Sequence, residues 1–296
     1  MNRSMGYSPM TLAAAFAAAR KFAGDFVPVP RSSSDLQVRF VPTMGSYRRA
    51  LPYYGEYLDS IAADTAAEVN AFLAEHGFDI QLQHWPNDGH NFGVAGVSDI
   101  LDHWVNAADL VTITGADGQS YKGFSLADEQ LCEIFEPPPV AFRNPVAQVR
   151  TKDGLNVRFV MCDPPDDQLH MARLARILHI HEPGRGRTGH SAAHLPMVDL
   201  NIEPDVSWLI GLVLSSPFGD WLVKQAKMQV MLKMNEKGFR AKEAAAMGMR
   251  EMVMAAPAGP LVFNRPFLMT AGKPDVPVPV FSAYIAQDTW TNPGNL

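Results

Sequence analysis

The segment "MQVMLKMNEKGFRAKEAAA", Met228–Ala246, decides the fold, because its two halves have opposite local preferences. The first half is typical of a strand and stops at Gly238. The second half continues into Phe239–Met254, which is rich in the helix formers Ala, Met, Glu, Lys and Arg. A Pro-broken stretch then leads to a second predicted strand, Pro260–Thr270. A strong helix former between two strands is therefore the feature that the fold has to explain.

The composition indicates a globular chain without a nucleic-acid or membrane surface. It has 296 residues, of which 47% are hydrophobic and 19% charged, enough to bury one sizeable core. The net charge is -6, and no run of Lys or Arg exceeds two residues, which argues against a nucleic-acid or anionic-membrane partner. Two cysteines, Cys132 and Cys162, are too few for a disulfide-rich scaffold or a Cys-type zinc site. No stretch approaches the ~20 apolar residues of a membrane span.

The N-terminal stretch, Met1–Asp25, has two interpretations. An early Arg, an apolar centre and no acid before Asp25 are typical of a signal or transit peptide, so the compartment stays open. A buried Ala-rich helix explains the same residues, with Ser8 as its N-cap and Pro9 in its first turn. We favour the helix, because Lys21 and Phe22 continue its pattern beyond the apolar run.

The rest of the chain alternates helix and strand patterns in one α+β domain, 1–296. We predict helices over Pro9–Ala23, Arg48–Ala62, Thr65–His76 and Gln168–Leu178, and a short helix in "SDILDHWVNAAD" with Ser98 as N-cap. We predict strands over Leu36–Val41, Leu110–Thr114, Ala147–Thr151, Leu155–Cys162, Met197–Ile202, Met228–Met234, Pro260–Thr270 and Val276–Ala286.

Motifs for catalysis, cofactors or metals are weak in this sequence. His179 and His181 are two residues apart, with His190 and His194 close by, and two His on one face of a strand are a pattern of some metal sites. A polar loop explains the same histidines, and we favour it. "GRGRTG" matches neither phosphate-binding motif, and no GxSxG accompanies the histidines. We therefore expect no enzyme, no cofactor and no metal site.

The C-terminal third resembles the serpin family, segment by segment and in order. The family's hinge pattern, acidic-x-Gly-x-x-Ala-x-x-Ala, is matched by Glu236, Gly238, Ala241 and Ala244. The family's signature of an apolar strand entering Asn-Lys/Arg-Pro-Phe is matched by Asn264, Arg265, Pro266 and Phe267. "YSPMTLAAAFAAA" is similar to the family's helix B, with Ser8, Pro9 and Thr11 in its Ser-Pro-x-Ser/Thr pattern. The resemblance covers about half of the chain and is loose over 30–150.

The resemblance implies a serpin-like fold with large, mainly antiparallel sheets and an exposed reactive-centre loop at about 236–259. Because the match starts at helix B, we expect the family's N-terminal helix to be absent. In an inhibitory serpin the cleaved loop inserts as a strand into the large sheet, releases stored strain and disables a covalently attached protease. This explains why a segment with helix propensity lies between two strands.

Several residues depart from the inhibitory pattern. Alternate residues of an inserted strand face the core, so the side chains that point inward would be Phe239, Ala241, Glu243 and Ala245. Phe239 is large where the family has a small residue, and overpacking costs ~1–3 kcal/mol. Glu243 would carry a carboxylate toward the core, at a cost of several kcal/mol unless it is paired or protonated. The shutter region differs too: the family's His is Met228 here, so we expect Ser8 and Thr11 to lack that partner.

The scissile bond of the predicted reactive-centre loop has two possible positions. Counting forward from Gly238 places the scissile bond at Met252–Val253, and counting back from Asn264 places it at Ala255–Ala256, with Met254 between them. Such residues suit a protease with a hydrophobic S1 pocket, of the elastase or chymotrypsin type. We favour a non-inhibitory protein that binds a protein partner or serves as a structural component. The alternative is a serine or cysteine protease inhibitor that acts by loop insertion.

Overall fold

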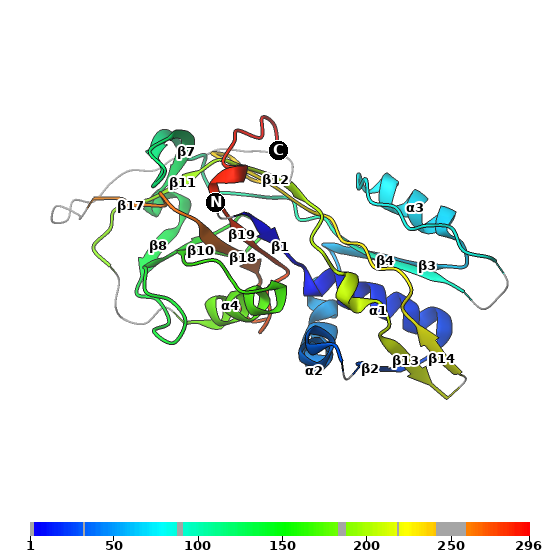
Figure 1. Ribbon diagram of the computed structural model, residues 1–296. Coiled ribbons are helices and arrows are strands. Elements are labelled where there is room, and N and C mark those ends of the chain that lie inside the picture. Colours follow the sequence, from blue (N-terminus) through cyan, green and yellow to red (C-terminus); the bar gives the residue numbers. More distant parts are fainter. Residues whose placement is uncertain (1–2, 32, 88–90, 183–187, 218, 241–258) are drawn as a thin grey trace. The chain divides into compact units, whose positions relative to one another are not determined.

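The computed structural model describes residues 3–31, 33–87, 91–182, 188–217, 219–240 and 259–296 (Figure 1). The chain forms two compact units. Unit 1 comprises 1–6, 100–201 and 231–296, and unit 2 comprises 7–99 and 202–230. Each unit therefore contains segments that are far apart in the sequence, and each is described separately.

A six-stranded sheet with the order β1-β19-β18-β10-β9-β8 forms the core of unit 1. All of its neighbouring strands are antiparallel. Its strands are β1 (Met5–Gly6), β8 (Cys132–Phe135), β9 (Val146–Arg150), β10 (Asn156–Met161), β18 (Phe267–Gly272) and β19 (Phe281–Ile285). Helix α4 (Gln168–Ile180) packs on β18 and β19 (Figure 1). Asp167 caps this helix by accepting a hydrogen bond from the His170 backbone, and Met171, Ala175 and Leu178 are buried.

Two four-stranded sheets complete unit 1. The first has the order β17-β11-β7-β6, and β17 runs parallel to β11. Its strands are β6 (Asp109–Thr114), β7 (Ser120–Leu126), β11 (Ala193–Pro196) and β17 (Leu261–Val262). The second has the order β12-β15-β16-β5, with β5 (Asp102–His103), β12 (Val198–Ile202), β15 (Val230–Asn235) and β16 (Gly238–Phe239). The 3-10 turns η2 (Asp128–Gln130) and η4 (Gln287–Thr289) also lie in this unit.

Unit 2 is built around α1 (Pro9–Ala23), which packs on the antiparallel pair of β3 (Leu58–Ala63) and β4 (Gly93–Ser98) (Figure 1). The packing is close at Gly96, where a Cβ atom would collide with the carbonyl oxygen of Thr11 and lie 2.8 Å from the amide nitrogen of Ala15. The other elements are α2 (Asp35–Ala50), η1 (Leu51–Tyr53), α3 (Ala66–Glu75), η3 (Ser207–Leu209) and a sheet of β14 (Gly219–Leu222), β13 (Val213–Ser216) and β2 (Val27–Val29).

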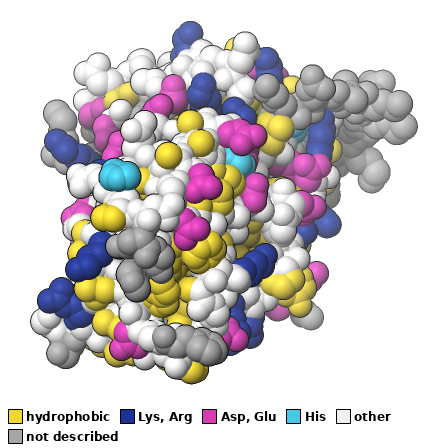
Figure 2. Space-filling view, turned by 90° about the vertical axis from the view of Figure 1, so that its right-hand side faces the viewer, with side chains coloured by type: hydrophobic (Ala, Val, Ile, Leu, Met, Phe, Trp, Pro, Cys, Tyr) yellow, Lys and Arg dark blue, Asp and Glu magenta, His cyan; other side chains and the backbone are white. Residues whose placement is uncertain are grey.

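Charged side chains of both signs are interspersed on the face shown in Figure 2, with hydrophobic side chains exposed between them. In unit 2 the exposed hydrophobic residues include Phe22, Val27, Val29 and Leu222. None of the described helices is long and apolar enough to cross a membrane.

Most predicted elements are confirmed, and three are wrong. The helices predicted over Pro9–Ala23, Thr65–His76 and Gln168–Leu178 are α1, α3 and α4. The strand predicted at Leu36–Val41 is part of α2, and the helix predicted at Arg48–Ala62 gives way to η1 and β3. The helix predicted after Ser98 is replaced by β5, because these residues pair with β16.

The strand boundaries also needed correction near the C-terminus. The strand predicted over Pro260–Thr270 is divided into β17 and β18, and that over Val276–Ala286 is the shorter β19. The predictions also missed the strands β1, β2, β7, β8, β11, β13, β14 and β16.

Candidate functional site

The candidate site is the hinge hairpin, residues 235–239, which precedes the predicted reactive loop. Strands β15 and β16 are antiparallel, with Met234 opposite Phe239 and Asn235 opposite Gly238. Only Glu236 and Lys237 separate the two strands. The other edge of β16 pairs with β5, so that Gly238 and Phe239 lie between two strands of one sheet.

Backbone hydrogen bonds hold the turn of this hairpin. The amide of Trp104 donates to the carbonyl oxygen of Lys237 at 3.2 Å. The amide of Ala108 donates to the carbonyl oxygen of Glu236 at 2.7 Å. Beyond the turn, the amide of Arg240 donates to the carbonyl oxygen of Lys233 at 2.8 Å. The hinge is therefore part of the sheet up to the last residue described before the loop.

Gly238 is required by the close approach of β5. A Cβ atom on Gly238 would collide with the carbonyl oxygen of Asp102 and lie 2.8 Å from the Cα atom of His103. Both neighbours are backbone atoms, so no side-chain rotation can relieve the clash. The close approach of β5 explains why this position needs a glycine, which the sequence pattern alone did not explain.

Phe239 anchors the hinge in the core. Its side chain is 2% exposed, and its ring centroid lies 5.9 Å from that of Trp104. The Trp104 ring also stacks with Phe124, with the two ring centroids 6.0 Å apart, and the Trp104 Nε1 donates to the carbonyl oxygen of Asn235 at 2.9 Å. The sheet thus holds a large aromatic ring at the position where we expected overpacking.

Asp102 fixes the strand that borders the hinge. Its carboxylate, 1% exposed, accepts hydrogen bonds from the Thr151 hydroxyl, from the His103 amide at 2.7 Å and from the Asp153 amide at 3.3 Å. Burial raises the pKa of this carboxyl, although the three hydrogen bonds oppose the shift. The amide of Lys152, in the turn between β9 and β10, also donates to the carbonyl oxygen of His103 at 3.0 Å.

Sequence reasoning missed Asp102 and Trp104, because it placed both in a helix. The only signal for them in the sequence is the aromatic and apolar content of "ILDHWV", which fits a strand as well as a helix.

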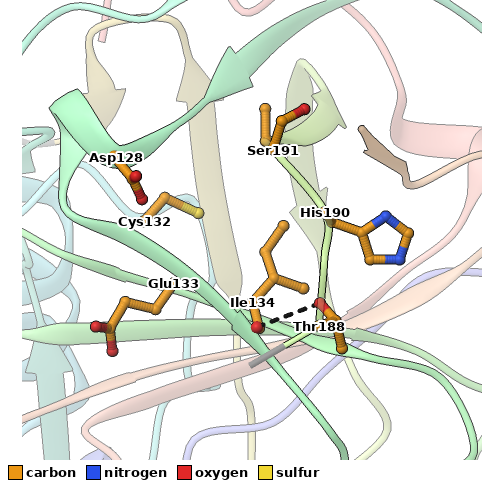
Figure 3. Close-up of a pocket in the computed structure, with 8 residues that line it drawn as sticks. Asp128, Cys132, Glu133, Ile134, Thr188, His190 and Ser191 are labelled. Carbon is orange, nitrogen blue, oxygen red and sulfur yellow. Dashed lines mark hydrogen bonds between the residues drawn. The ribbon is translucent and has the colours of Figure 1, made fainter. Parts of the chain in front are cut away.

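The other end of the loop is tied to β11. His190 Nδ1 lies 2.9 Å from the carbonyl oxygen of Gly259, to which it can donate, and the Leu261 amide donates to the carbonyl oxygen of Ala192 at 2.8 Å. A small cavity of about 120 Å³ lies beside this connection. Figure 3 shows side chains that line it from η2, from β8 and from the segment before β11, among them Asp128, Cys132, Glu133, Ile134, Thr188, His190 and Ser191.

The chemistry of this cavity does not favour nucleophilic catalysis. Burial, together with the nearby carboxylates of Asp128 and Glu133, raises the pKa of the Cys132 thiol to about 12. The thiol is therefore protonated at neutral pH, whereas a catalytic cysteine needs a thiolate. Thr188 is engaged by donating from its hydroxyl to the carbonyl oxygen of Ile134 at 3.2 Å (Figure 3).

The signature residues have structural contacts in unit 1. The Ala116 amide donates to the Asn264 carbonyl oxygen at 2.7 Å, and Arg265 donates to the side-chain oxygen of Asn144 at 2.6 Å. Phe267 is fully buried, and Pro266 is buried beside it. The signature therefore joins β17 to β18 and anchors both in the core.

The shutter-like residues lie in unit 2. Ser8 caps α1, because its Oγ accepts from the Thr11 amide at 3.4 Å, and the Thr11 hydroxyl donates back to the Ser8 carbonyl oxygen at 2.9 Å. These bonds are local to the helix start. Met228 is buried, with 6% of its surface exposed.

Several predicted site residues lie outside the described part of the chain. They are the hinge residues Ala241, Glu243 and Ala244 and the scissile-bond candidates Met252, Val253, Met254, Ala255 and Ala256. Their roles stay predictions.

The histidines that suggested a metal site have other surroundings. His179 belongs to α4 and is 4% exposed, with Nε2 2.9 Å from the Val276 carbonyl oxygen. Burial lowers the pKa of His179 to about 4. No group of three or more His, Cys, Asp or Glu among the described residues is placed to hold a metal.

Solved structures that resemble the chain define its fold class as serpin-like. The chain matches Tengpin, a thermophilic serpin in its native state, with a TM-score of 0.60 at 10% identity, over 97% of this chain and 89% of that one. It matches human thyroxine-binding globulin complexed with thyroxine with a TM-score of 0.58 at 12% identity, over 97% and 92%. Serpin48, a highly specific serpin of the insect Tenebrio molitor, gives 0.57 at 11% identity, over 96% and 92%.

The predicted serpin-like fold is therefore confirmed. By sequence, no protein-family model and no curated protein matches the chain. The likeness extends over almost the whole chain, including 30–150, where the sequence resemblance was loose.

Proposed function

We propose that this chain is a non-enzymatic serpin-fold protein that acts by binding a protein partner or as a structural component, without loop insertion. The observation that supports this most is the pairing of Gly238 and Phe239 with β15 and β5. Insertion-driven inhibition uses the free energy released when a cleaved loop enters the sheet. Hinge residues that already pair in the sheet add nothing to that release.

The residues beyond the hinge support the same proposal. Continued insertion would carry Glu243 onto the same face as Phe239, since side chains alternate along a strand. A buried carboxylate costs several kcal/mol unless it is paired or protonated. Insertion would therefore release less free energy and would also bury the Glu243 carboxylate. Both effects favour a loop that stays outside the sheet, where its Met side chains can contact a partner.

The alternative is a suicide-substrate inhibitor of a protease with a hydrophobic S1 pocket. One observation favours it: the sheet accepts two residues between β15 and β5, and the Arg240 amide continues this pairing to Lys233. The next residues would enter along the same path.

Incubation with elastase-like and chymotrypsin-like proteases separates the two functions. We expect cleavage in the region Arg250–Ala256 without an adduct that survives SDS. An SDS-stable covalent adduct would overturn the proposal in favour of inhibition.

A double variant tests whether Phe239 and Glu243 are what prevents loop insertion. Phe239→Thr with Glu243→Ala removes both departures from the inhibitory pattern, so we expect it to form more adduct than the wild type. Met231→Thr on the exposed side of β15 is the matched control and is expected to behave as the wild type. Equal behaviour of all three would show that Phe239 and Glu243 do not decide insertion.

A further inference from the structure

One side chain links the hinge hairpin to the C-terminal segment of the chain. Asn235, 2% exposed, ends β15. Its Oδ1 accepts from the Lys237 amide at 2.9 Å, which closes the turn of the hairpin. Its Nδ2 donates to the carbonyl oxygen of Gly294 at 3.1 Å. The two ends of one amide group therefore join the turn to the segment 291–296.

The C-terminal segment is itself anchored on both sides of its exposed residues. Trp290, 3% exposed, lies 5.0 Å from Tyr121 and 6.3 Å from Phe267 between ring centroids, and Pro293 is buried. Gly294 has a positive φ of 71°, and its amide donates to the Asn292 side chain at 3.0 Å. These contacts hold the Gly294 carbonyl in place for Asn235.

The hinge is thus held from two sides of its sheet. On the core side, Met234 and Phe239 are opposite one another and buried. The next pair, Asn235 and Gly238, has the opposite orientation, because side chains alternate along a strand. The core side is held by burial of an aromatic ring, and on the other side the Asn235 amide connects the hairpin to the C-terminal segment.

We propose that residues 291–296 are a strap that locks the hinge hairpin in the sheet through Asn235. A ligand or partner that displaces the strap removes the acceptor of the Asn235 amide, and this loosens the hairpin from which the loop departs. The strap therefore couples events at the C-terminal segment to the loop. This regulation goes beyond the proposed function, since it holds for a loop that binds a partner and for one that inserts.

Two variants break the strap in different ways: one substitutes Asn235, and the other shortens the C-terminal segment. Asn235→Asp keeps the acceptor for the Lys237 amide but places a carboxylate oxygen against the Gly294 carbonyl. A chain that ends at Pro293 removes that carbonyl and leaves Asn235 intact. Asn295→Ala, an exposed position in the same segment, is the control.

Hydrogen exchange of the amides of residues 238–240, followed by mass spectrometry, measures the lock. We expect both strap variants to exchange about tenfold faster there, the effect of losing one hydrogen bond, while β10 amides and the control variant stay as in the wild type. Trypsin cleavage after Lys237 and Arg240, both exposed, should accelerate in parallel. Unchanged exchange at the hinge in the shortened chain, or an equal rise in β10, would overturn the strap. Neither result depends on adduct formation with a protease.

Discussion

A single methyl group on Gly238 should displace β16 from its position between β15 and β5. In Gly238→Ala the new Cβ atom collides with the carbonyl oxygen of Asp102 and lies 2.8 Å from the Cα atom of His103. Carbon atoms prefer ~3.5–4.0 Å, so the backbone of β16 or β5 has to move by roughly 1 Å. Because Asp102 ties β5 to the turn after β9, we expect β16 to move.

The size of the effect follows from two opposing contributions. Overpacking costs ~1–3 kcal/mol. Replacement of Gly by Ala restricts the unfolded chain and returns ~0.4–1 kcal/mol where the backbone permits it. We therefore expect the free energy of unfolding to fall by ~1–2 kcal/mol.

The assay is urea denaturation combined with trypsin cleavage after Arg240. Gly259→Ala, at the other end of the loop, is the matched control, because its Cβ would meet no atom within 4 Å. The control should retain or slightly raise the stability. If Gly238→Ala and Gly259→Ala show the same stability and the same cleavage rate, the close approach of β5 does not hold the hinge.

Three further predictions concern the surroundings of the hinge and the core of unit 2. Trp104→Phe removes the indole N–H that donates to the carbonyl oxygen of Asn235, so urea denaturation should show a loss of ~0.5–1.5 kcal/mol, and no loss would refute this role. Burial raises the pKa of Asp102 above 3.8, so the folded state binds more protons than the unfolded state between 3.8 and that raised pKa. Stability should fall as pH rises through this window, and Asp102→Asn should lack that fall; identical pH profiles would contradict it. Gly96→Ala places a methyl against the backbone of α1 at Thr11, so the melting temperature should decrease, and an unchanged value would show that β4 can shift without cost.

The sequence predicted best those elements that local interactions specify. Helix α1 has the predicted bounds, because the Ser8 cap and Pro9 define its start within a few residues. The signature around Pro266 was informative for a similar reason: it lies in a contiguous run whose pattern does not depend on distant partners.

The errors arose where tertiary contacts override local patterns. "LQVRFV" alternates like a strand, yet it lies in α2, because Phe40, Met44 and Tyr47 form a buried helical face and Ser34 caps the helix start. Ala-rich "SIAA" favours a helix, yet it is β3, which pairs along its whole length with β4.

The hinge site was predicted in part. The hinge glycine was identified from its pattern, but the atoms that exclude a side chain there, at Asp102 and His103, lie more than a hundred residues earlier in the chain. No local signal pairs β5 with β16, and the space for Phe239 depends on the orientation of Trp104.

Thermal unfolding before and after cleavage of the loop tests the central claim most directly. The protein is cut by an elastase-like protease, the position of the cut within Arg250–Ala256 is verified by mass spectrometry, and both forms are melted under the same conditions. The hinge is already paired in the sheet, so we predict that the melting temperature changes by no more than about 2 °C, equivalent to about 1 kcal/mol for a chain of this length. A rise of more than about 10 °C on cleavage would contradict the account, because it would mean that the loop enters the sheet with a large gain in stability.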